Sequence, residues 1–219
     1  MSGLEARHKP RSLTWKNRIL GKAEALFWRR GYQSTTIVDI ANACGCRPAN
    51  IYNYFSSKED ILYGVISHIT HSAVALVRPL GEDITTDPAE LLRSFIKTHF
   101  EFLAGMKRSI VFIADTGLKD LSEEHRRAII ELRNTYDDAL LKILRRAKES
   151  DDCDDIDERI VSYLVPSLII RSNVWYSPKG RLSADEVSDI IFQLVYLGIK
   201  PRNGRPIPVS DCLPVTDSA

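Results

Sequence analysis

Residues 45–58 read GCRPANIYNYFSSK, and the fold can be worked out from this stretch. Gly45 and Pro48 frame a tight turn, because glycine commonly ends a helix and proline suits the first turn of the next one. After the turn, Ile51 and Phe55 stand four positions apart with polar residues between them. One side of a short helix is therefore expected to pack inward, while its other side presents polar side chains to solvent.

A second short helix precedes this turn. The sequence TIVD at 36–39 predicts where it begins, because the Thr36 hydroxyl and the Asp39 carboxylate can form a capping box. An earlier helix over 14–30 is predicted to end at Gly31. Two short helices joined by a glycine-containing turn form a helix-turn-helix, whose second helix enters the major groove of DNA.

The polar residues of the predicted recognition helix suit a DNA duplex. Arg47 can contact guanine or phosphate, and Asn50 and Asn53 can offer amide groups to adenine. Tyrosine hydroxyl groups can hold phosphates. Lys58 begins the next helix, where free backbone amides and a positive charge both favour a phosphate.

The charge distribution favours the same interpretation. Residues 1–58 contain ten lysines and arginines and three acids, a net charge of +7, whereas the remaining residues contain 20 basic and 26 acidic ones, a net charge of −6. Taken singly, Tyr52 and Tyr54 would also fit half-buried aromatic residues, and Lys58 a solvated surface lysine. The basic region together with the motif predicts DNA binding.

Every long periodic segment of the sequence is helical, and no alternating strand pattern is evident. Capping residues predict where further helices begin, at Ser57, Asp87, Ser122 and Ser183. A short helix is expected over 109–114, and Pro166 is expected to kink the penultimate helix. We predict an all-α fold of about nine helices, with a helix-turn-helix DNA-binding domain and basic N-terminal arm at 1–58, a larger effector-binding and dimerisation domain at 59–199, and a Pro-rich tail at 200–219.

Composition narrows the class of protein. The chain has 219 residues and 44% hydrophobic content, enough for a substantial core. Its polar N-terminus does not resemble a secretory signal, and the longest strongly apolar run, 160–170, is too short to span a bilayer. The four cysteines have neither CxxC nor zinc-finger spacing. We expect a cytoplasmic protein with no membrane association, cofactor or bound metal.

Two alternatives remain open at this stage. A metal-dependent helical enzyme is one, since His68, His71 and His99 can supply ligands, but no acid completes a recognisable set and no phosphate loop or nucleophile motif occurs. We therefore predict that the protein is not an enzyme. The other alternative is a DNA-binding dimer that responds to no small molecule.

The segment 19–62, ILGKAEALFWRRGYQSTTIVDIANACGCRPANIYNYFSSKEDIL, resembles the N-terminal domain of the tetracycline-repressor (TetR) family. The resemblance implies that Thr36, the recognition helix, the aromatic residue before Phe55 and the lysine of the SK motif contact DNA. Arg47 and Pro48 stand where many relatives carry a serine cap and a small residue, so Arg47 contacts DNA either from the turn or from the helix. The predicted DNA-contacting residues are Thr35, Thr36, Arg47, Pro48, Ala49, Asn50, Tyr52, Asn53, Tyr54 and Lys58.

The resemblance further implies a helical C-terminal domain that dimerises through its last two helices and holds an effector pocket. Pairing two recognition helices on successive major-groove faces raises affinity and specificity, so a homodimer is also expected on physical grounds. The apolar stripe of the last helix fits either a dimer interface or the core of its own chain. The predicted interface residues are Leu164, Leu168, Arg171, Val187, Ile190, Ile191 and Leu194.

Residues 171–199, RSNVWYSPKGRLSADEVSDIIFQLVYLGI, resemble the C-terminal segment of TetR-type repressors of fatty-acid and steroid catabolism, which respond to acyl-coenzyme A thioesters. The resemblance implies a repressor that binds a palindromic operator in double-stranded DNA and is released by an acyl-CoA or another hydrophobic effector. Apolar residues at helical spacing also fit a plain core. The predicted effector-contacting residues are Phe100, Leu103, Met106, Ile110, Arg133, Tyr136, Leu140, Ile169, Asn173 and Trp175.

Overall fold

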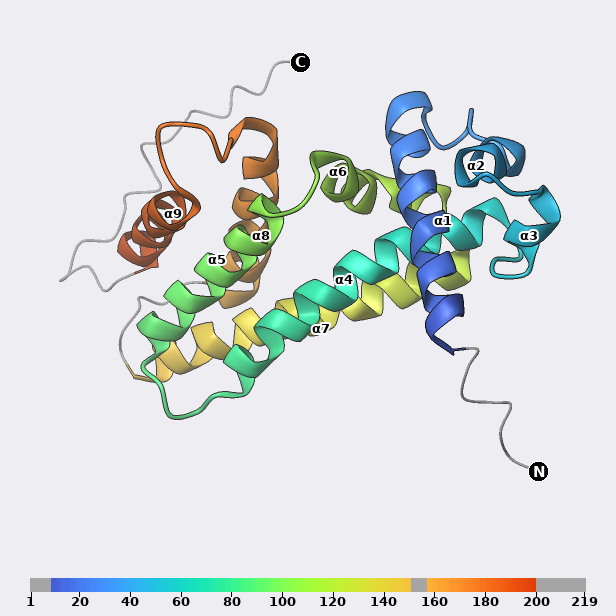
Figure 1. Ribbon diagram of the computed structural model, residues 1–219. Coiled ribbons are helices and arrows are strands. Elements are labelled where there is room, and N and C mark those ends of the chain that lie inside the picture. Colours follow the sequence, from blue (N-terminus) through green and yellow to red (C-terminus); the bar gives the residue numbers. More distant parts are fainter. Residues whose placement is uncertain (1–8, 151–156, 200–219) are drawn as a thin grey trace, which may run out of the picture.

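The computed structural model describes residues 9–150 and 157–199, and within them the chain is all α-helical, as predicted. The described residues form nine α-helices and one 3-10 turn, and contain no strand (Figure 1). The helices are α1 Lys9–Arg30, α2 Ile37–Cys44, α3 Pro48–Tyr52, α4 Lys58–Glu82, α5 Pro88–Ala104, α6 Arg108–Thr116, α7 Glu123–Glu149, α8 Glu158–Trp175 and α9 Ala184–Ile199, with the 3-10 turn at Gly117–Asp120. The predicted tail at 200–219 lies outside the described residues.

The first three helices, which we call the head, form the predicted helix-turn-helix. The Thr36 hydroxyl accepts the Asp39 N–H at 3.1 Å and the Asp39 carboxylate accepts the Thr36 N–H at 2.9 Å, so the capping box is present. Gly45 ends α2 with a φ of 65°, a left-handed conformation that favours glycine. Helix α3 ends at Tyr52, so Phe55, which was expected on the inward side of this helix, lies instead in the turn that leads to the Ser57 cap of α4.

The core of the head continues into α4 and is not a separate unit. Ile19, Ile40 and Ile51 from the head are fully buried in one cluster with Ile61 and Ile66 of α4. Residues from α6 and α7 complete the same cluster. The first half of α4 therefore packs with the head, and its second half packs with the remaining helices. We call the second half of α4, together with α5 to α9, the body.

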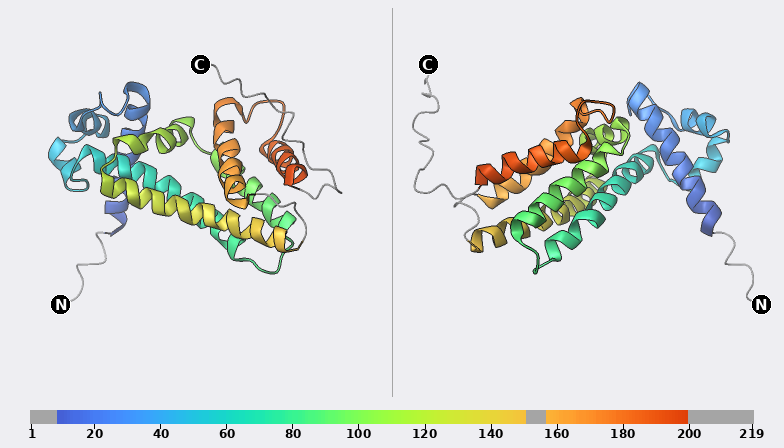
Figure 2. Two further views of the ribbon diagram at one scale, coloured as in Figure 1. Left: turned by 180° about the vertical axis from the view of Figure 1, so that it is seen from behind. Right: turned by 60° about the vertical axis from the view of Figure 1, so that its left-hand side comes forward.

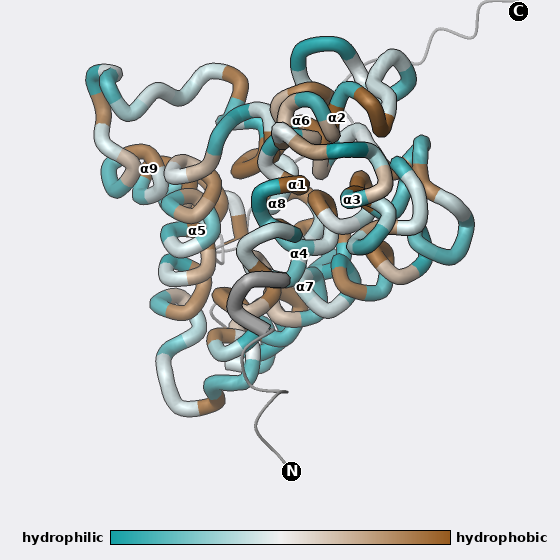
Figure 3. Tube along the Cα trace, turned by 45° about the vertical axis from the view of Figure 1, so that its right-hand side comes forward, coloured by the Kyte–Doolittle hydropathy of each residue, from teal (hydrophilic) through white to brown (hydrophobic). Residues whose placement is uncertain are grey.

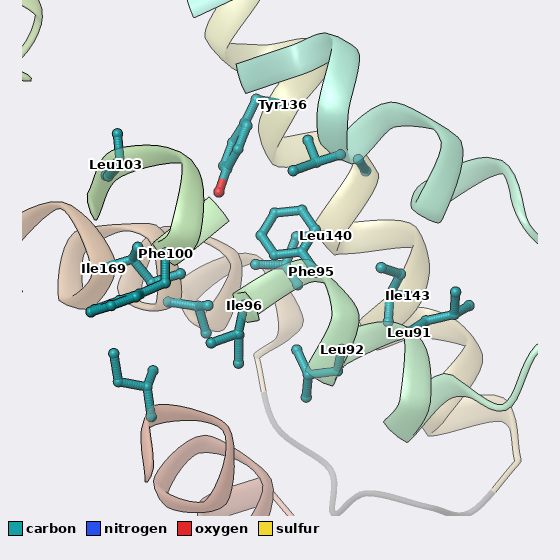
Figure 4. Close-up of a cluster of buried hydrophobic side chains, with 14 of the residues drawn as sticks. Leu91, Leu92, Phe95, Ile96, Phe100, Leu103, Tyr136, Leu140, Ile143 and Ile169 are labelled. Carbon is teal, nitrogen blue, oxygen red and sulfur yellow. The ribbon is translucent and has the colours of Figure 1, made fainter. Parts of the chain in front are cut away.

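Helices α4 and α7 run side by side through the centre of the molecule (Figures 1 and 2). The two backbones approach closely at Gly81, since a Cβ atom there would lie 2.6 Å from the Cα of Ala139. Helices α5, α8 and α9 pack beyond this pair around a second cluster of buried residues, part of which appears in Figure 4. The head lies at one end of the molecule, and α8 and α9 lie at the other (Figure 2).

Helix α4 is long and apolar enough, by length and composition alone, to cross a membrane. Its apolar residues are nevertheless interspersed with polar ones, as the alternating colours along the trace in Figure 3 illustrate. Eight of its residues, from Ile61 to Val77, are buried against neighbouring helices. This packing is that of a core helix that connects the head with the body.

Candidate functional site

The polar side of α3 is open to solvent at the end of the molecule. Arg47, Ala49, Asn50, Tyr52 and Asn53 are exposed, and Pro48 is half-buried. Arg47 occupies the position before the first helical residue with an extended backbone, so its side chain leaves from the turn and not from the helix. Thr36, at the start of α2, is exposed as well. Most of the predicted DNA-contacting residues are therefore exposed, in α3, in the turn before it or at the start of α2.

Thr35 differs from its neighbours in the predicted set. Its side chain is 0% exposed, and its hydroxyl donates to the carbonyl oxygen of Gly31 at 2.9 Å. The residue therefore closes the turn after α1 and presents no side-chain atom to DNA in this structure. The two neighbouring threonines therefore have different roles: Thr36 caps α2 at the protein surface, whereas Thr35 points into the head.

Lys58 is already engaged within the protein. Its ammonium group donates to the carbonyl oxygens of Tyr32 at 2.9 Å and Gln33 at 3.3 Å, and lies 4.3 Å from the centre of the Tyr32 ring. An ammonium has three N–H donors, so one remains for a phosphate. Lys58 thus fastens the loop between α1 and α2 to the start of α4. Tyr54 is half-buried and packs against the head core.

The body contains a cavity of about 320 Å³, which we call the main cavity. Its walls come from α4, α5, α6, α7 and α8, and most of the lining is apolar, with Ile69, Leu103 and Ile170 among its members. A volume of this size lies at the lower end of the range for small-molecule sites. The cavity is therefore suited to a small apolar group.

A buried polar pair stands in the wall of the main cavity. The Tyr136 hydroxyl and the Nδ1 atom of His99 lie 2.5 Å apart, and Figure 4 shows the hydroxyl of Tyr136 pointing toward α5, the helix that carries His99. Burial lowers the pKa of His99 to about 3 and raises the pKa of Tyr136. Both side chains are therefore neutral at pH 7.

Charged groups border another part of the same cavity. The Arg133 guanidinium donates to the carbonyl oxygen of Ala114 in α6 at 2.6 Å. Burial raises the pKa of Asp137 to about 6, although the nearby Arg133 charge opposes that shift. Asp115 lines the cavity as well. The polar part of the wall thus holds one positive and two acidic side chains.

A smaller cavity of about 220 Å³ lies between the end of α5, the start of α6 and the end of α8. Its lining includes Met106, Arg108 and Asn173, and Leu103 lines both cavities. Arg108 donates to the carbonyl oxygen of Tyr176 at 2.7 Å, which joins the start of α6 to the end of α8. The two cavities are therefore neighbours across Leu103.

The structure separates the predicted effector-contacting residues into three groups. Leu103, Arg133 and Tyr136 line the main cavity, and Met106 and Asn173 line the smaller one. The others line neither cavity: Phe100, Leu140 and Ile169 are buried in the body core, Ile110 packs beside it, and Trp175 is 59% exposed.

Sequence reasoning missed several residues of the main cavity. Ile69, Ala73, Val111 and Ile170 line it, but their apolar periodicity matches that of core residues and gave no separate signal. From the sequence, His99 is a candidate only for metal binding. Its position on an otherwise apolar helical face was the one available hint.

Two helices of the cavity wall also contact the head. Helix α4 contributes Ile69 to the cavity, and α6 contributes Val111 and Ala114. At the start of α6 the Ser109 hydroxyl donates to the Glu24 carboxylate of α1, which is only 3% exposed. Because an unpartnered buried carboxylate is costly, this bond fixes α1 to α6. The cavity is thereby connected with the head along α4 and α6.

Helices α8 and α9 carry exposed apolar side chains. Leu164, Leu168 and Ile190 are exposed, and Leu194 is 69% exposed. Further exposed apolar residues on the same two helices are Ile160, Tyr163, Val174, Trp175 and Leu197. Clusters of this kind mark interaction surfaces in soluble proteins.

Three residues of the predicted interface stand apart from this apolar group. Val187 and Ile191 are buried in the body core, because they lie on the side of α9 that packs on α5. Arg171 is exposed on α8.

The structure does not group the three histidines that were considered as metal ligands. His68 and His71 are exposed on α4, whereas His99 is buried in the body. Within 9–150 and 157–199, the one cluster of metal-ligand side chains consists of Glu59, Asp60 and His125. The Nδ1 atom of His125 lies 2.7 Å from the Glu59 carboxylate, so the cluster joins the start of α4 to the start of α7.

Comparisons with known proteins agree with this architecture. Residues 19–64 match the bacterial regulatory proteins of the tetR family, and residues 85–199 match the tetracyclin repressor-like C-terminal domain. The transcriptional repressor KstR2 of Mycobacterium tuberculosis is 27% identical over 186 residues, which cover 84% of this chain and 92% of KstR2. Its solved structure, described as a ketosteroid transcriptional regulator, covers 86% of this chain and 96% of its own with a TM-score of 0.74.

Two further solved structures share the fold. The TetR family transcriptional regulator PfmR from Thermus thermophilus is 32% identical, covers 84% of this chain and 100% of its own, and has a TM-score of 0.74. AibR, solved with isovaleryl coenzyme A and operator DNA, is 23% identical, covers 83% of this chain and 97% of its own, and has a TM-score of 0.73. With both halves matched and the helix-turn-helix in place, the chain belongs to the TetR family of transcriptional regulators.

Proposed function

We propose that the protein is a cytoplasmic, effector-responsive repressor that binds a palindromic operator as a homodimer and is released by a small hydrophobic ligand. The observation that carries this proposal is the position of the main cavity. Its wall includes Ile69 of α4 and Val111 of α6, and both helices also pack against the head. A ligand in the cavity therefore contacts the same helices that hold the recognition surface.

The mechanism follows from differential binding. Two recognition helices in a dimer fit successive major-groove faces when they stand ~34–36 Å apart. A ligand that binds more tightly to a conformation with a different spacing shifts the population away from the DNA-bound form. The exposed apolar residues of α8 and α9, Leu164, Leu168, Ile190 and Leu194, supply the surface on which we propose that two copies pair.

Acyl-coenzyme A thioesters are the ligand class that we propose. The solved complex of AibR with isovaleryl coenzyme A motivates this choice, because that protein has the same fold. A cavity of about 320 Å³ has room for a short or branched acyl group, but not for a whole coenzyme A molecule as well. The nucleotide part of such a ligand would therefore lie outside the main cavity.

Two measurements test the proposed function. Sequencing the duplexes that the purified protein enriches from a random pool should yield an inverted repeat. A panel of short, long and ring-bearing thioesters should then raise the melting temperature and release that DNA, as ligands that prefer one folded state do. The free acids are matched controls, which should act more weakly because they lack the phosphates. If no thioester stabilises the protein or changes its affinity for DNA, the proposed ligand class is wrong.

A further inference from the structure

We infer that the main cavity recognises a neutral carbonyl oxygen through the Nε2–H group of His99. This inference takes from the proposed function only that the main cavity is the ligand site. It adds the specific atom of the ligand that the protein identifies and the residue that identifies it. The inference rests on the tautomer of His99, on the free donor that this tautomer leaves, and on the charges around it.

The bond between Tyr136 and His99 determines which nitrogen of the histidine carries the proton. If the Tyr136 hydroxyl donates to Nδ1 of His99, the histidine proton must lie on Nε2. If instead Nδ1–H donates to Tyr136, the buried hydroxyl proton has no acceptor, because the described residues supply no other partner for it. Each arrangement leaves one donor without a partner in the protein, either Nε2–H or the hydroxyl proton. The first arrangement is favoured because a phenol hydroxyl is a stronger hydrogen-bond donor than an imidazole N–H, and an imidazole nitrogen is a stronger acceptor than a phenol oxygen. Nε2 therefore carries a proton.

The Nε2 proton of His99 has no acceptor within the described protein. His99 is only 5% exposed, and its Nε2 atom has no hydrogen-bond partner among the described residues. Among the described residues, Arg126 Nε is the only side-chain atom that is both fully buried and without a hydrogen-bond partner. Nε2 of His99 also has no partner, so it must be partly accessible. Since His99 forms part of the wall of the main cavity, we place its free N–H at the cavity surface. A polar donor on a residue buried this deeply favours a ligand that brings an acceptor.

The chemistry of the cavity wall limits the kind of acceptor that a ligand can bring. Ile69, Leu103 and Ile170 make much of the wall apolar, so the ligand group that enters must be mostly hydrocarbon. The carboxyl groups of Asp115 and Asp137 outnumber the Arg133 charge on the cavity wall, which disfavours a ligand carboxylate. A ketone oxygen or the acyl oxygen of a thioester satisfies both conditions, because it accepts a hydrogen bond and carries no charge.

The experiment uses two probes of nearly equal shape, cyclohexanone and methylenecyclohexane, which differ in having C=O or C=CH₂. Their affinities are measured for the wild-type protein and for the double variant His99→Leu, Tyr136→Phe, which replaces both hydrogen-bond partners with apolar groups. One hydrogen bond contributes about 1 kcal/mol, so the ratio of ketone to hydrocarbon affinity should fall about fivefold in the variant. The control Val111→Ala removes wall contacts only, and should change both affinities by a similar factor.

A second measurement covers the case in which the double variant does not fold. In the wild-type protein labelled with ¹⁵N-histidine, cyclohexanone should shift the Nε2 resonance of His99 and methylenecyclohexane should not. An unchanged affinity ratio in a folded double variant overturns the inference, as does equal behaviour of the two probes in the resonance experiment or failure of both to bind. Because neither probe contains coenzyme A, these outcomes are separate from a failure of thioesters to release DNA, which would count against the proposed function alone.

Discussion

The close contact between α4 and α7 gives a prediction whose sign can be worked out from the structure. In Gly81→Ala, the added methyl group would lie 2.6 Å from the Cα, 2.8 Å from the Cβ and 2.8 Å from the carbonyl oxygen of Ala139. Ordinary van der Waals contacts of such an atom are 3.4–4 Å. Two of these three neighbours are backbone atoms within a helix, so no side chain can rotate away. The two helices must separate by about 1 Å.

The expected magnitude combines two opposing effects. Overpacking of a well-packed core costs about 1–3 kcal/mol, whereas replacing glycine by alanine within a helix contributes about 1 kcal/mol of helix propensity. Because backbone atoms cannot rotate aside, the overpacking cost at this position should fall in the upper part of its range, about 2–3 kcal/mol, so Gly81→Ala should lower the free energy of unfolding by about 1–2 kcal/mol. For a protein of this size, that corresponds to a fall of roughly 2–8 °C in melting temperature.

Gly21→Ala is the matched control, because Gly21 lies within α1, is exposed, and has nothing within 4 Å of the position of an added Cβ. Only the propensity gain applies there, so its melting temperature should rise by about 2–4 °C. Thermal denaturation followed by circular dichroism, at one protein concentration for all variants, measures both changes. The reasoning fails if Gly81→Ala is as stable as the wild type while Gly21→Ala is stabilised.

Three other predictions concern DNA binding, assembly and pH. Tyr54→Phe and Lys58→Ala should weaken binding to specific and random duplexes alike, and Lys58→Ala should also lower the slope of log affinity against log salt concentration by about one unit. Asn50→Ala should instead relax base preference at one operator position. Binding titrations at several salt concentrations, with specific and random duplexes, distinguish these results. Leu194→Glu should give monomers in analytical ultracentrifugation at micromolar concentration, and a DNA-competent dimer would contradict the proposed interface. Burial raises the pKa of Asp137 from 3.8 to about 6, so ionisation of this carboxyl group lowers the free energy of unfolding progressively as the pH rises through that interval. Asp137→Asn should therefore raise the melting temperature relative to wild type at pH 7 and leave it nearly unchanged at pH 3.5.

Local signals in the sequence predicted the helices well. The cap at Ser57 is present, since its hydroxyl accepts the N–H of Asp60, and the box at Ser183 is present with Glu186. These bonds join residues three positions apart, so the sequence contains both partners. Two helix ends differ from the prediction: α1 begins at Lys9 and not near Thr14, and α3 ends at Tyr52, before Phe55. Helix ends of this kind fray and lack a fixed signal.

What the sequence by itself determined is the helical order, the turn at Gly45 and the residues available to DNA, because caps, turns and periodicity act over a few neighbouring positions. Periodicity indicated the apolar side of each helix, but the tertiary structure decided which of those apolar residues are buried, line a cavity or remain exposed. Trp175 is exposed although it continues the apolar period of α8, and Thr35, in the turn before α2, is buried although its neighbour Thr36 is exposed. The pairing of His99 with Tyr136 joins positions 37 residues apart, and only the packing of α5 on α7 brings these two side chains to one cavity wall.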